Sequence, residues 1–166
     1  MEYFLLIHDF FIIKGKRAFV GNLIIPIILG LLIFYCSNNS IYIKNASTFH
    51  TNLITVFGIL IGFTISAFTM LLTVNNENIV NAKSKLINVK LYSKEISLYD
   101  SVLIGLAYLI LIQGFFLIAN FIYPIFISIE SQYGKIIFSI NIAIATYIIL
   151  ILMRNILDFY FILTKK

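Results

Sequence analysis

Four long apolar runs constrain this chain more than any other feature. They cover about residues 18–36, 51–74, 101–123 and 136–153, and none contains Asp, Glu, Lys or Arg. Each is close to the roughly 20 helical residues needed to cross the hydrocarbon core of a bilayer. Only 11% of all residues are charged, whereas a soluble domain carries about 25%. We therefore expect an all-α, four-helix transmembrane bundle, with residues 1–166 forming one integral membrane domain.

The first residues follow a different pattern. Residues 3–13 are largely apolar but contain His8 and Asp9, and the cations Lys14, Lys16 and Arg17 come directly after them. The segment is too short to span a bilayer. Its charges follow the apolar part, whereas in a secretory signal peptide they precede it. We expect an amphipathic helix over residues 3–13 that lies in the membrane interface.

Basic residues are unevenly divided among the segments that connect the runs. With the N-terminus in the cytoplasm, the outer segments 37–50 and 124–134 form short loops, and the outer side holds only Lys44 and, directly after the second loop, Lys135. The other ten Lys and Arg residues fall on inner segments. Because cytoplasmic loops are enriched in Lys and Arg, both termini are predicted to be cytoplasmic. Heavy use of Ile, Asn, Lys, Phe and Tyr indicates an AT-rich gene of bacterial or phage origin. Together with the apolar runs, this predicts a location in the bacterial inner membrane.

The cytoplasmic loop 75–99 is the largest segment outside the predicted spans. Ile79, Ala82, Leu86 and Val89 recur at steps of three or four, which favours a continuation of the second helix. Alternation of Ile87, Val89 and Leu91 with polar residues is a weaker signal for a strand. The loop's lysines either only determine topology or also contact anionic lipid headgroups or an acidic cytoplasmic partner. These residues are Lys83, Lys85, Lys90 and Lys94.

One face of the second run carries a stripe of small and hydroxyl residues. Its members are Thr51, Thr55, Gly58, Gly62, Ser66, Thr69 and Thr73, at steps of three or four. Small side chains let helices approach closely in lipid, and hydroxyls can bond across helices. The stripe is therefore interpreted as a packing face within one protomer, a symmetric contact between protomers, or the lining of a hydrated path.

Other polar side chains at membrane depth are amides. Asn22 lies in the first run, Gln113 and Asn120 in the third, and Asn141 in the fourth. A buried amide needs a hydrogen-bonding partner in lipid, so we expect these residues to link helices or to line a pore.

The composition of the spans argues against catalysis. They contain no acid, base or histidine, and His8 and His50 fall on opposite sides of the membrane in the predicted topology. The single cysteine, Cys36, excludes an internal disulfide. Proton-coupled pumps and voltage sensors require ionisable residues in their spans. We expect no enzymatic activity, no cofactor, no metal and no direct contact with nucleic acid.

Span order, size and two segments resemble small four-span membrane proteins of anti-phage systems. The segments are TVFGILIGFTISAFTMLLTV and the lysine-bearing NAKSKLINVK that follows it. The chain is similar in pattern to the Kiwa membrane subunit and to the Rex exclusion membrane protein of lambdoid phage. The first resemblance implies a homo-oligomeric membrane sensor or scaffold that holds a soluble cytoplasmic partner. The second implies a channel that depolarises the infected cell, and a holin-like lesion former is a further alternative.

Overall fold

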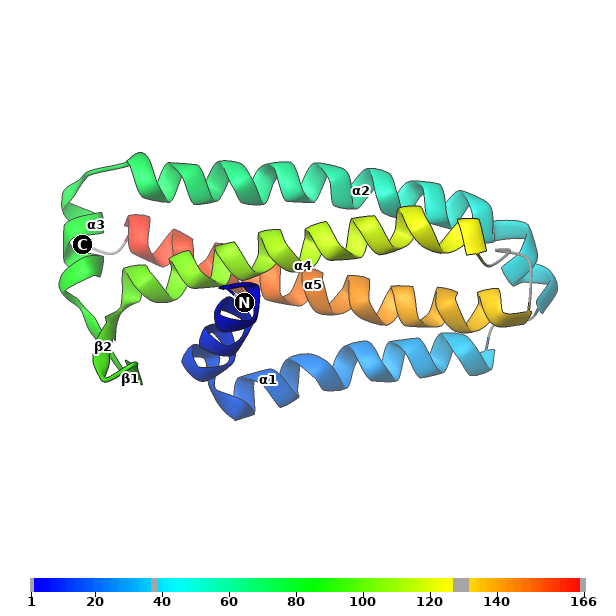
Figure 1. The fold of residues 1–166 in the computed structure, drawn as a ribbon, viewed down its shortest axis with the longest axis horizontal. Coiled ribbons are helices and arrows are strands. Elements are labelled where there is room, and N and C mark those ends of the chain that lie inside the picture. The colour runs from blue at the N-terminus through cyan, green and yellow to red at the C-terminus, as the bar shows by residue number, and fades with distance from the viewer. Residues whose placement is uncertain (1, 37–38, 127–131, 165–166) are drawn as a thin grey trace.

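The computed structural model describes residues 2–36, 39–126 and 132–164 and consists of long helices with one short hairpin (Figure 1). The elements in chain order are α1 (Glu2–Cys36), α2 (Asn39–Thr73), α3 (Glu77–Ser84), β1 (Leu86–Leu91), β2 (Lys94–Ser97), α4 (Leu98–Phe126) and α5 (Gln132–Thr164). The hairpin and α3 lie together at one end of the bundle, beside the C-terminal end of α5 (Figure 1). We call the segment of residues 75–97 the hairpin end.

Three of the long helices are apolar enough to cross a membrane. They comprise Asn45–Thr73, Leu98–Phe126 and Tyr133–Thr164. The two parts of α1, Tyr3–Gly15 and Val20–Cys36, provide a fourth span if they are taken as one bent pair. The predicted helical fold, with three to four candidate membrane-spanning helices, is confirmed.

A break at Gly15 divides α1. Its φ of 72° and ψ of 156° lie outside the helical region, and a positive φ of this kind favours glycine. The two parts of α1 are bent by 106° relative to each other. The first part, which we call the N-terminal arm (Tyr3–Gly15), crosses the bundle, while the second runs along it (Figure 1).

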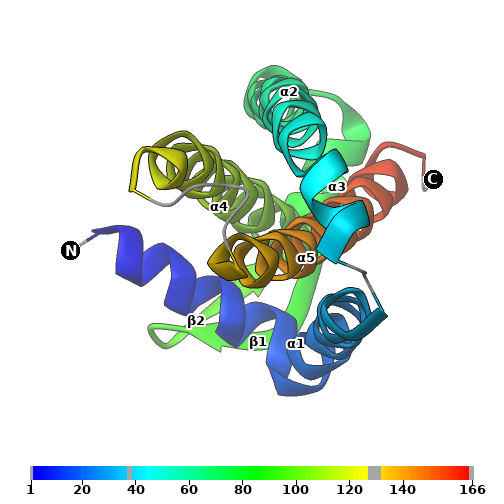
Figure 2. The ribbon, with the colours of Figure 1, turned by 90° about the vertical axis from the view of Figure 1, so that its right-hand side faces the viewer.

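Viewed from the end, α5 occupies the centre of the bundle, with α1, α2 and α4 around it (Figure 2). Helix α1 packs mainly on α5, and α2 packs mainly on α4. Gly30 permits the close approach of α1 to α5. A Cβ atom added there would lie 3.1 Å from the Ser139 carbonyl oxygen and 3.1 Å from the Ala143 Cβ.

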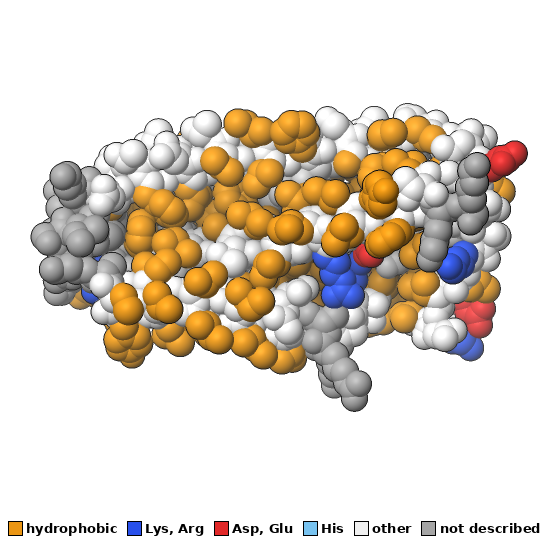
Figure 3. Space-filling model, turned by 180° about the vertical axis from the view of Figure 1, so that it is seen from behind, with side chains coloured by type: hydrophobic (Ala, Val, Ile, Leu, Met, Phe, Trp, Pro, Cys, Tyr) orange, Lys and Arg blue, Asp and Glu red, His pale blue; other side chains and the backbone are white. Residues whose placement is uncertain are grey.

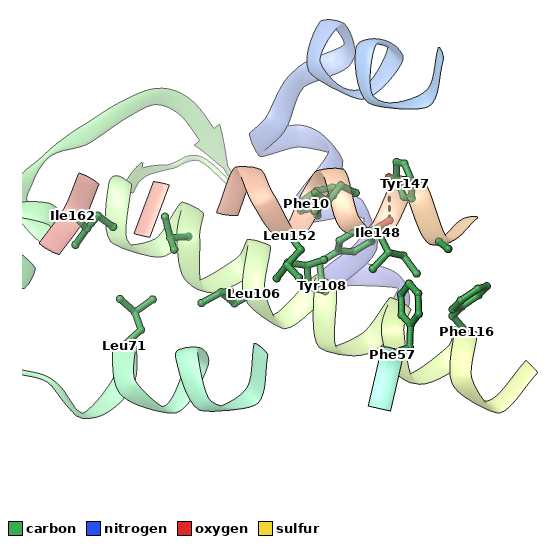
Figure 4. Packing of buried hydrophobic residues seen from close by; sticks show 14 of the residues in the cluster. Phe10, Phe57, Leu71, Leu106, Tyr108, Phe116, Tyr147, Ile148, Leu152 and Ile162 are labelled. Atoms are coloured by element: carbon green, nitrogen blue, oxygen red, sulfur yellow. Dashed lines mark hydrogen bonds between the residues drawn. The ribbon is translucent and has the colours of Figure 1, made fainter. Parts of the chain in front are cut away.

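The core is built from large side chains of several helices (Figure 4). Phe57 of α2 and Phe116 of α4 meet edge to face, with ring centroids 4.8 Å apart. Phe10 of the N-terminal arm stacks on Tyr108 of α4 at 3.9 Å. The Tyr108 and Tyr147 hydroxyls lie 3.3 Å apart and join α4 to α5. Aromatic packing therefore connects the arm, α2, α4 and α5.

Residues 75–97 differ from the favoured prediction. The second helix ends at Thr73, and a new helix begins after Asn76, whose side chain accepts a hydrogen bond from the Ile79 amide at 2.9 Å. Beyond Ser84 the chain forms the antiparallel hairpin β1–β2. The helix prediction is wrong for Leu86 and Val89, and the weaker strand signal was the correct one.

The hairpin turn explains why the sequence signal was weak. Tyr92 and Ser93 adopt φ values of 48° and 68°, which is the left-handed conformation of a two-residue type I′ turn. Such turns usually contain Asn or Gly, and neither is present here. After the hairpin, Ser97 and Asp100 form a capping box. The Ser97 Oγ accepts from the Asp100 amide at 3.1 Å, and the Asp100 carboxylate accepts from the Ser97 amide at 3.2 Å.

The segments predicted as outer loops are shorter than expected. Helix α2 already begins at Asn39, and α4 continues past Pro124 to Phe126. Proline lacks an amide hydrogen, so the Asn120 carbonyl loses its usual helical donor at position 124. His50 lies 2.9 Å from this carbonyl through its Nε2 atom. A side chain of α2 is thus placed to donate to the carbonyl that Pro124 leaves without its helical donor.

The close contact at Gly30 leads to a stability prediction. Replacement of Gly30 with Val should lower the free energy of unfolding by about 1–3 kcal/mol, because the added side chain overpacks the interface between α1 and α5. Gly21→Val is the matched control, since a Cβ at Gly21 meets no atom within 4 Å. The midpoint of thermal denaturation in detergent should fall for Gly30→Val only, and equal midpoints for the two variants would contradict the packing described.

Candidate functional site

The polar stripe of α2 lies on the outside of the bundle. All seven members, Thr51, Thr55, Gly58, Gly62, Ser66, Thr69 and Thr73, are exposed in the single chain. An added Cβ at Gly58 or Gly62 would meet nothing within 4 Å. The side of α2 that packs on the bundle instead carries Leu53, Phe57, Thr64 and Leu71.

The interpretation of the stripe as a packing face within one protomer is therefore wrong. Helical periodicity shows that residues share a face, but it does not show in which direction that face points. Two of the predicted roles remain: a contact between protomers and the lining of a path between them.

The stripe's hydroxyl groups are satisfied by their own helix. Each bonds to the carbonyl four residues earlier, as in Thr55 to Thr51 at 3.0 Å, Ser66 to Gly62 at 2.9 Å and Thr73 to Thr69 at 3.0 Å. Thr51 and Thr69 make equivalent bonds to Ser47 and Ile65. No hydroxyl hydrogen on this face is left without an acceptor, so the face is compatible with lipid, yet the oxygens can still accept a hydrogen bond.

Two of the predicted intramembrane amides meet in the interior. The Asn141 Nδ2 of α5 donates to the Asn120 Oδ1 of α4 at 3.0 Å. The Asn120 Nδ2 donates to the Phe116 carbonyl at 2.9 Å. Both side chains are buried, so this pair provides a polar link between α4 and α5 near the end opposite the hairpin.

Gln113 lies on the same face of α4 and is fully buried. Neither of its amide atoms has a hydrogen-bonding partner among the described residues, and the same holds for the Asn155 Oδ1. Asn22 is half-buried on α1. These positions show that the amides of α4 and α5 belong to a packed core. A hydrated pore through a single chain would therefore require that core to open.

Several interior polar residues were not identified from the sequence. Asn155 and Thr64 are almost completely buried, and Tyr108 pairs with Tyr147. A usable signal did exist for Asn155, which lies fourteen residues after Asn141 and on the same helical face. Thr64 carried no such signal, because it belongs to a run that already contains many threonines.

The hairpin end carries the predicted lysines on its surface. Lys83, Lys85, Lys90 and Lys94 are all exposed. Lys83 lies over the Tyr99 ring, 4.8 Å from its centroid. On the face shown in Figure 3, acidic and basic side chains appear at this end and in one cluster part of the way along the bundle, and hydrophobic side chains are spread over the surface between the two ends.

The N-terminal arm is held by two polar contacts in addition to the Phe10 stack. Lys14 Nζ lies 2.8 Å from the Asp158 carboxylate of α5, and its side chain is only 10% exposed. The Tyr92 hydroxyl at the hairpin turn donates to the Asp9 carboxylate at 3.0 Å. This hydrogen bond raises the pKa of Tyr92. The arm therefore contacts both the core of the bundle and the hairpin end.

The described residues give little basis for a catalytic or metal centre. Within residues 2–36, 39–126 and 132–164, no three His, Cys, Asp or Glu side chains come together. His50 is engaged by the Asn120 carbonyl and by the Tyr123 ring, and Cys36 is exposed. The absence of enzymatic activity stays a prediction from the sequence.

Comparison with known proteins gives no match. No family model, no curated protein and no solved structure matches the chain. The resemblance to four-span proteins of anti-phage systems therefore stays a prediction.

Proposed function

We propose that the protein is a non-enzymatic subunit of the bacterial inner membrane that associates with copies of itself through the stripe of α2. Its hairpin end holds or signals to a soluble cytoplasmic partner. By the pattern of its spans, we place this activity in a phage-defence system, as a membrane sensor or scaffold.

The observation that carries the proposal is the position of the stripe. It faces away from the bundle for its whole length, and a Cβ at Gly58 or Gly62 has open space around it. From Thr51 to Thr73 the stripe extends about 33 Å, close to the thickness of the hydrocarbon core. Small residues on a lipid-facing helix let a second helix approach closely, and a two-fold contact would pair this face with itself.

The proposed orientation places the hairpin end in the cytoplasm. Lys83, Lys85, Lys90 and Lys94 are exposed there, and the C-terminal end of α5 lies at the same end of the bundle. Lys135 lies near the start of α5, at the opposite end. The rule that cytoplasmic segments are rich in Lys and Arg supports this orientation. An exposed basic surface in the cytoplasm is suited to an acidic protein partner.

Cysteine cross-linking tests self-association. In a Cys36→Ser background, Gly62→Cys should form a disulfide-linked dimer in native membranes under mild oxidation, because a disulfide requires Cα atoms within about 7 Å. Phe63→Cys is the control at the same depth, since Phe63 is 68% exposed but lies off the stripe. Equal cross-linking at both positions, or none at Gly62→Cys, would be evidence against a specific contact through the stripe.

Purification from native membranes tests the partner. The wild-type chain should retain a soluble cytoplasmic protein, and the triple change Lys85→Glu, Lys90→Glu, Lys94→Glu should reduce its recovery by about tenfold, since like charges across an interface repel. The variant with Arg at all three positions preserves the charge and should retain the partner. Consistent recovery of no soluble protein would overturn the partner proposal, and recovery of periplasmic proteins alone would overturn the orientation as well.

A second candidate function is a pore between protomers that depolarises the membrane. It is favoured by the exposed, uncharged hydroxyl groups of the stripe, whose oxygens can accept hydrogen bonds from water. In reconstituted liposomes, the wild type should dissipate an imposed potential, and Gly62→Leu should reduce the rate by about tenfold because its side chain narrows the path. Phe63→Leu should leave the rate unchanged. Absence of ion flux from the wild type would reject this function.

A further inference from the structure

The N-terminal arm (Tyr3–Gly15) is joined to the rest of α1 by a hinge and packs on the bundle through one face. Gly15 adopts a φ of 72°, and the two parts of α1 are bent by 106°. Phe10 and Ile13 of the arm are buried against the bundle, whereas Phe4 is exposed. The arm is therefore a separate helix that docks on the other helices after the chain changes direction at Gly15.

Docking of the arm brings Lys14 to Asp158 of α5. The Lys14 Nζ lies 2.8 Å from the Asp158 carboxylate, and the two side chains are 10% and 35% exposed. A charge that is largely removed from water depends on its partner for compensation, so loss of either partner disfavours the docked position. Lys14 directly precedes Gly15, and the ion pair therefore fixes the arm next to its hinge.

The hairpin has few buried contacts that would keep it in place. A two-stranded hairpin is marginally stable in water unless it packs against another element. Here Ile96 and Ser97 are buried at the end joined to α4, and the other strand residues are exposed or half-buried. The strand pairing is also irregular between Ile87 and Lys90. The turn end of the hairpin therefore depends on support from another element.

The arm provides a contact at this turn end. The Tyr92 hydroxyl donates to the Asp9 carboxylate at 3.0 Å, and α1 also contacts β1. Asp9 directly precedes Phe10, whose ring stacks on Tyr108 of α4 (Figure 4). Because Phe10 is fixed on α4, the docked arm also fixes Asp9, and with it the position of the hairpin turn.

We propose that the N-terminal arm is a strap that orders the hairpin end, with its hinge at Gly15 and the pair of Lys14 and Asp158 as its latch. While the latch is closed, Asp9 holds Tyr92. When the latch opens, the arm moves about Gly15 and the hairpin turn loses its support. The coupling is reciprocal, so a molecule that binds the ordered hairpin also favours the docked arm. A role of the strap in signalling rests on the proposed function, whereas the strap itself requires neither a partner nor self-association.

Charge reversal tests the latch. Lys14→Glu places two carboxylates together in a partly buried position and should release the arm. The double change Lys14→Glu, Asp158→Lys restores an ion pair and the original net charge, and should restore docking. Arg154→Glu is the matched control, since it makes the same change in charge one helical turn from Asp158. Arg154 is exposed and forms no ion pair with any residue that the structure describes.

Two readouts on the full-length protein in nanodiscs follow the arm and the hairpin separately. The distance between spin labels at Phe4→Cys on the arm and Phe121→Cys on α4, in a Cys36→Ser background, reports the position of the arm. Both labelled positions are exposed, and dilution with unlabelled chain restricts the measurement to distances within one molecule. Hydrogen exchange of the amides of residues 86–97 reports the order of the hairpin.

Lys14→Glu should change the distance between the labels and raise the exchange rate of residues 86–97 by about tenfold, because a partly buried charge loses its partner. Arg154→Glu and the double reversal should match the parent chain in both readouts. Exchange of residues 101–123 should stay slow in every variant, which shows that the long helices remain folded.

Tyr92→Phe tests the hairpin side of the strap alone. It removes the hydroxyl that bonds to Asp9 from an exposed side chain, so the core is not disturbed. Exchange of residues 86–97 should rise by about fivefold, as expected for the loss of one hydrogen bond. The distance between the labels should stay as in the parent chain. This variant tests the strap even if Lys14→Glu fails to fold.

Two kinds of result would overturn the proposal. A label distance that Lys14→Glu leaves unchanged, or that the double reversal does not restore, would show that the ion pair is not the latch. Unchanged exchange of residues 86–97 in a chain whose arm is displaced, or in Tyr92→Phe, would show that the hairpin is ordered without the arm. Neither readout involves a cytoplasmic partner, so failure of the strap is distinguishable from failure of the proposed function, which purification from native membranes tests.

Discussion

The structure depends on the rule that polar groups buried in hydrocarbon must find partners within the protein. On α2 the exposed hydroxyls meet it by bonding to carbonyls of their own helix, as Ser66 does with Gly62. In the interior, Asn141 and Asn120 meet it by pairing across α4 and α5. Where Pro124 removes a backbone donor, His50 of α2 lies in position to replace it at the Asn120 carbonyl. Gln113, without a partner among the described residues, is the clearest departure from the rule.

The same rule indicates which surfaces of the protein are available for contacts with other molecules. Because the interior polar groups lie in a packed core, contacts with other molecules are expected on exposed surfaces, among them the stripe of α2 and the hairpin end. The break at Gly15 allows the N-terminal arm to reach both the core of the bundle and the hairpin end. Its positive φ turns the chain back across the bundle, where Phe10 stacks on Tyr108 and Asp9 meets Tyr92. The arm thus places exposed apolar side chains, such as Phe4, and a contact with the hairpin on one short helix.

Much of the fold could be predicted from the sequence, because apolar runs without charge leave few structures open to a chain. The limits of the helices were less predictable. Asn39 begins α2 inside a segment expected to be a loop, and Pro124 lies within α4, since helix ends depend on contacts such as that of His50. The hairpin was only weakly signalled, because its turn uses Tyr92 and Ser93 in place of Asn or Gly. The residues of the candidate site could be identified from the sequence, but not all of the residues that surround them in the fold.

The sequence by itself determined that this chain has helices long and apolar enough to span a membrane, and that seven small and hydroxyl residues share one face of α2. Composition and periodicity are sufficient for both, because they depend only on the transfer of side chains into lipid and on the pitch of a helix. Only the tertiary structure decided which face of α2 is buried. That choice depends on how well Leu53, Phe57, Thr64 and Leu71 pack against α4, a property of two surfaces together that the sequence of one helix does not contain.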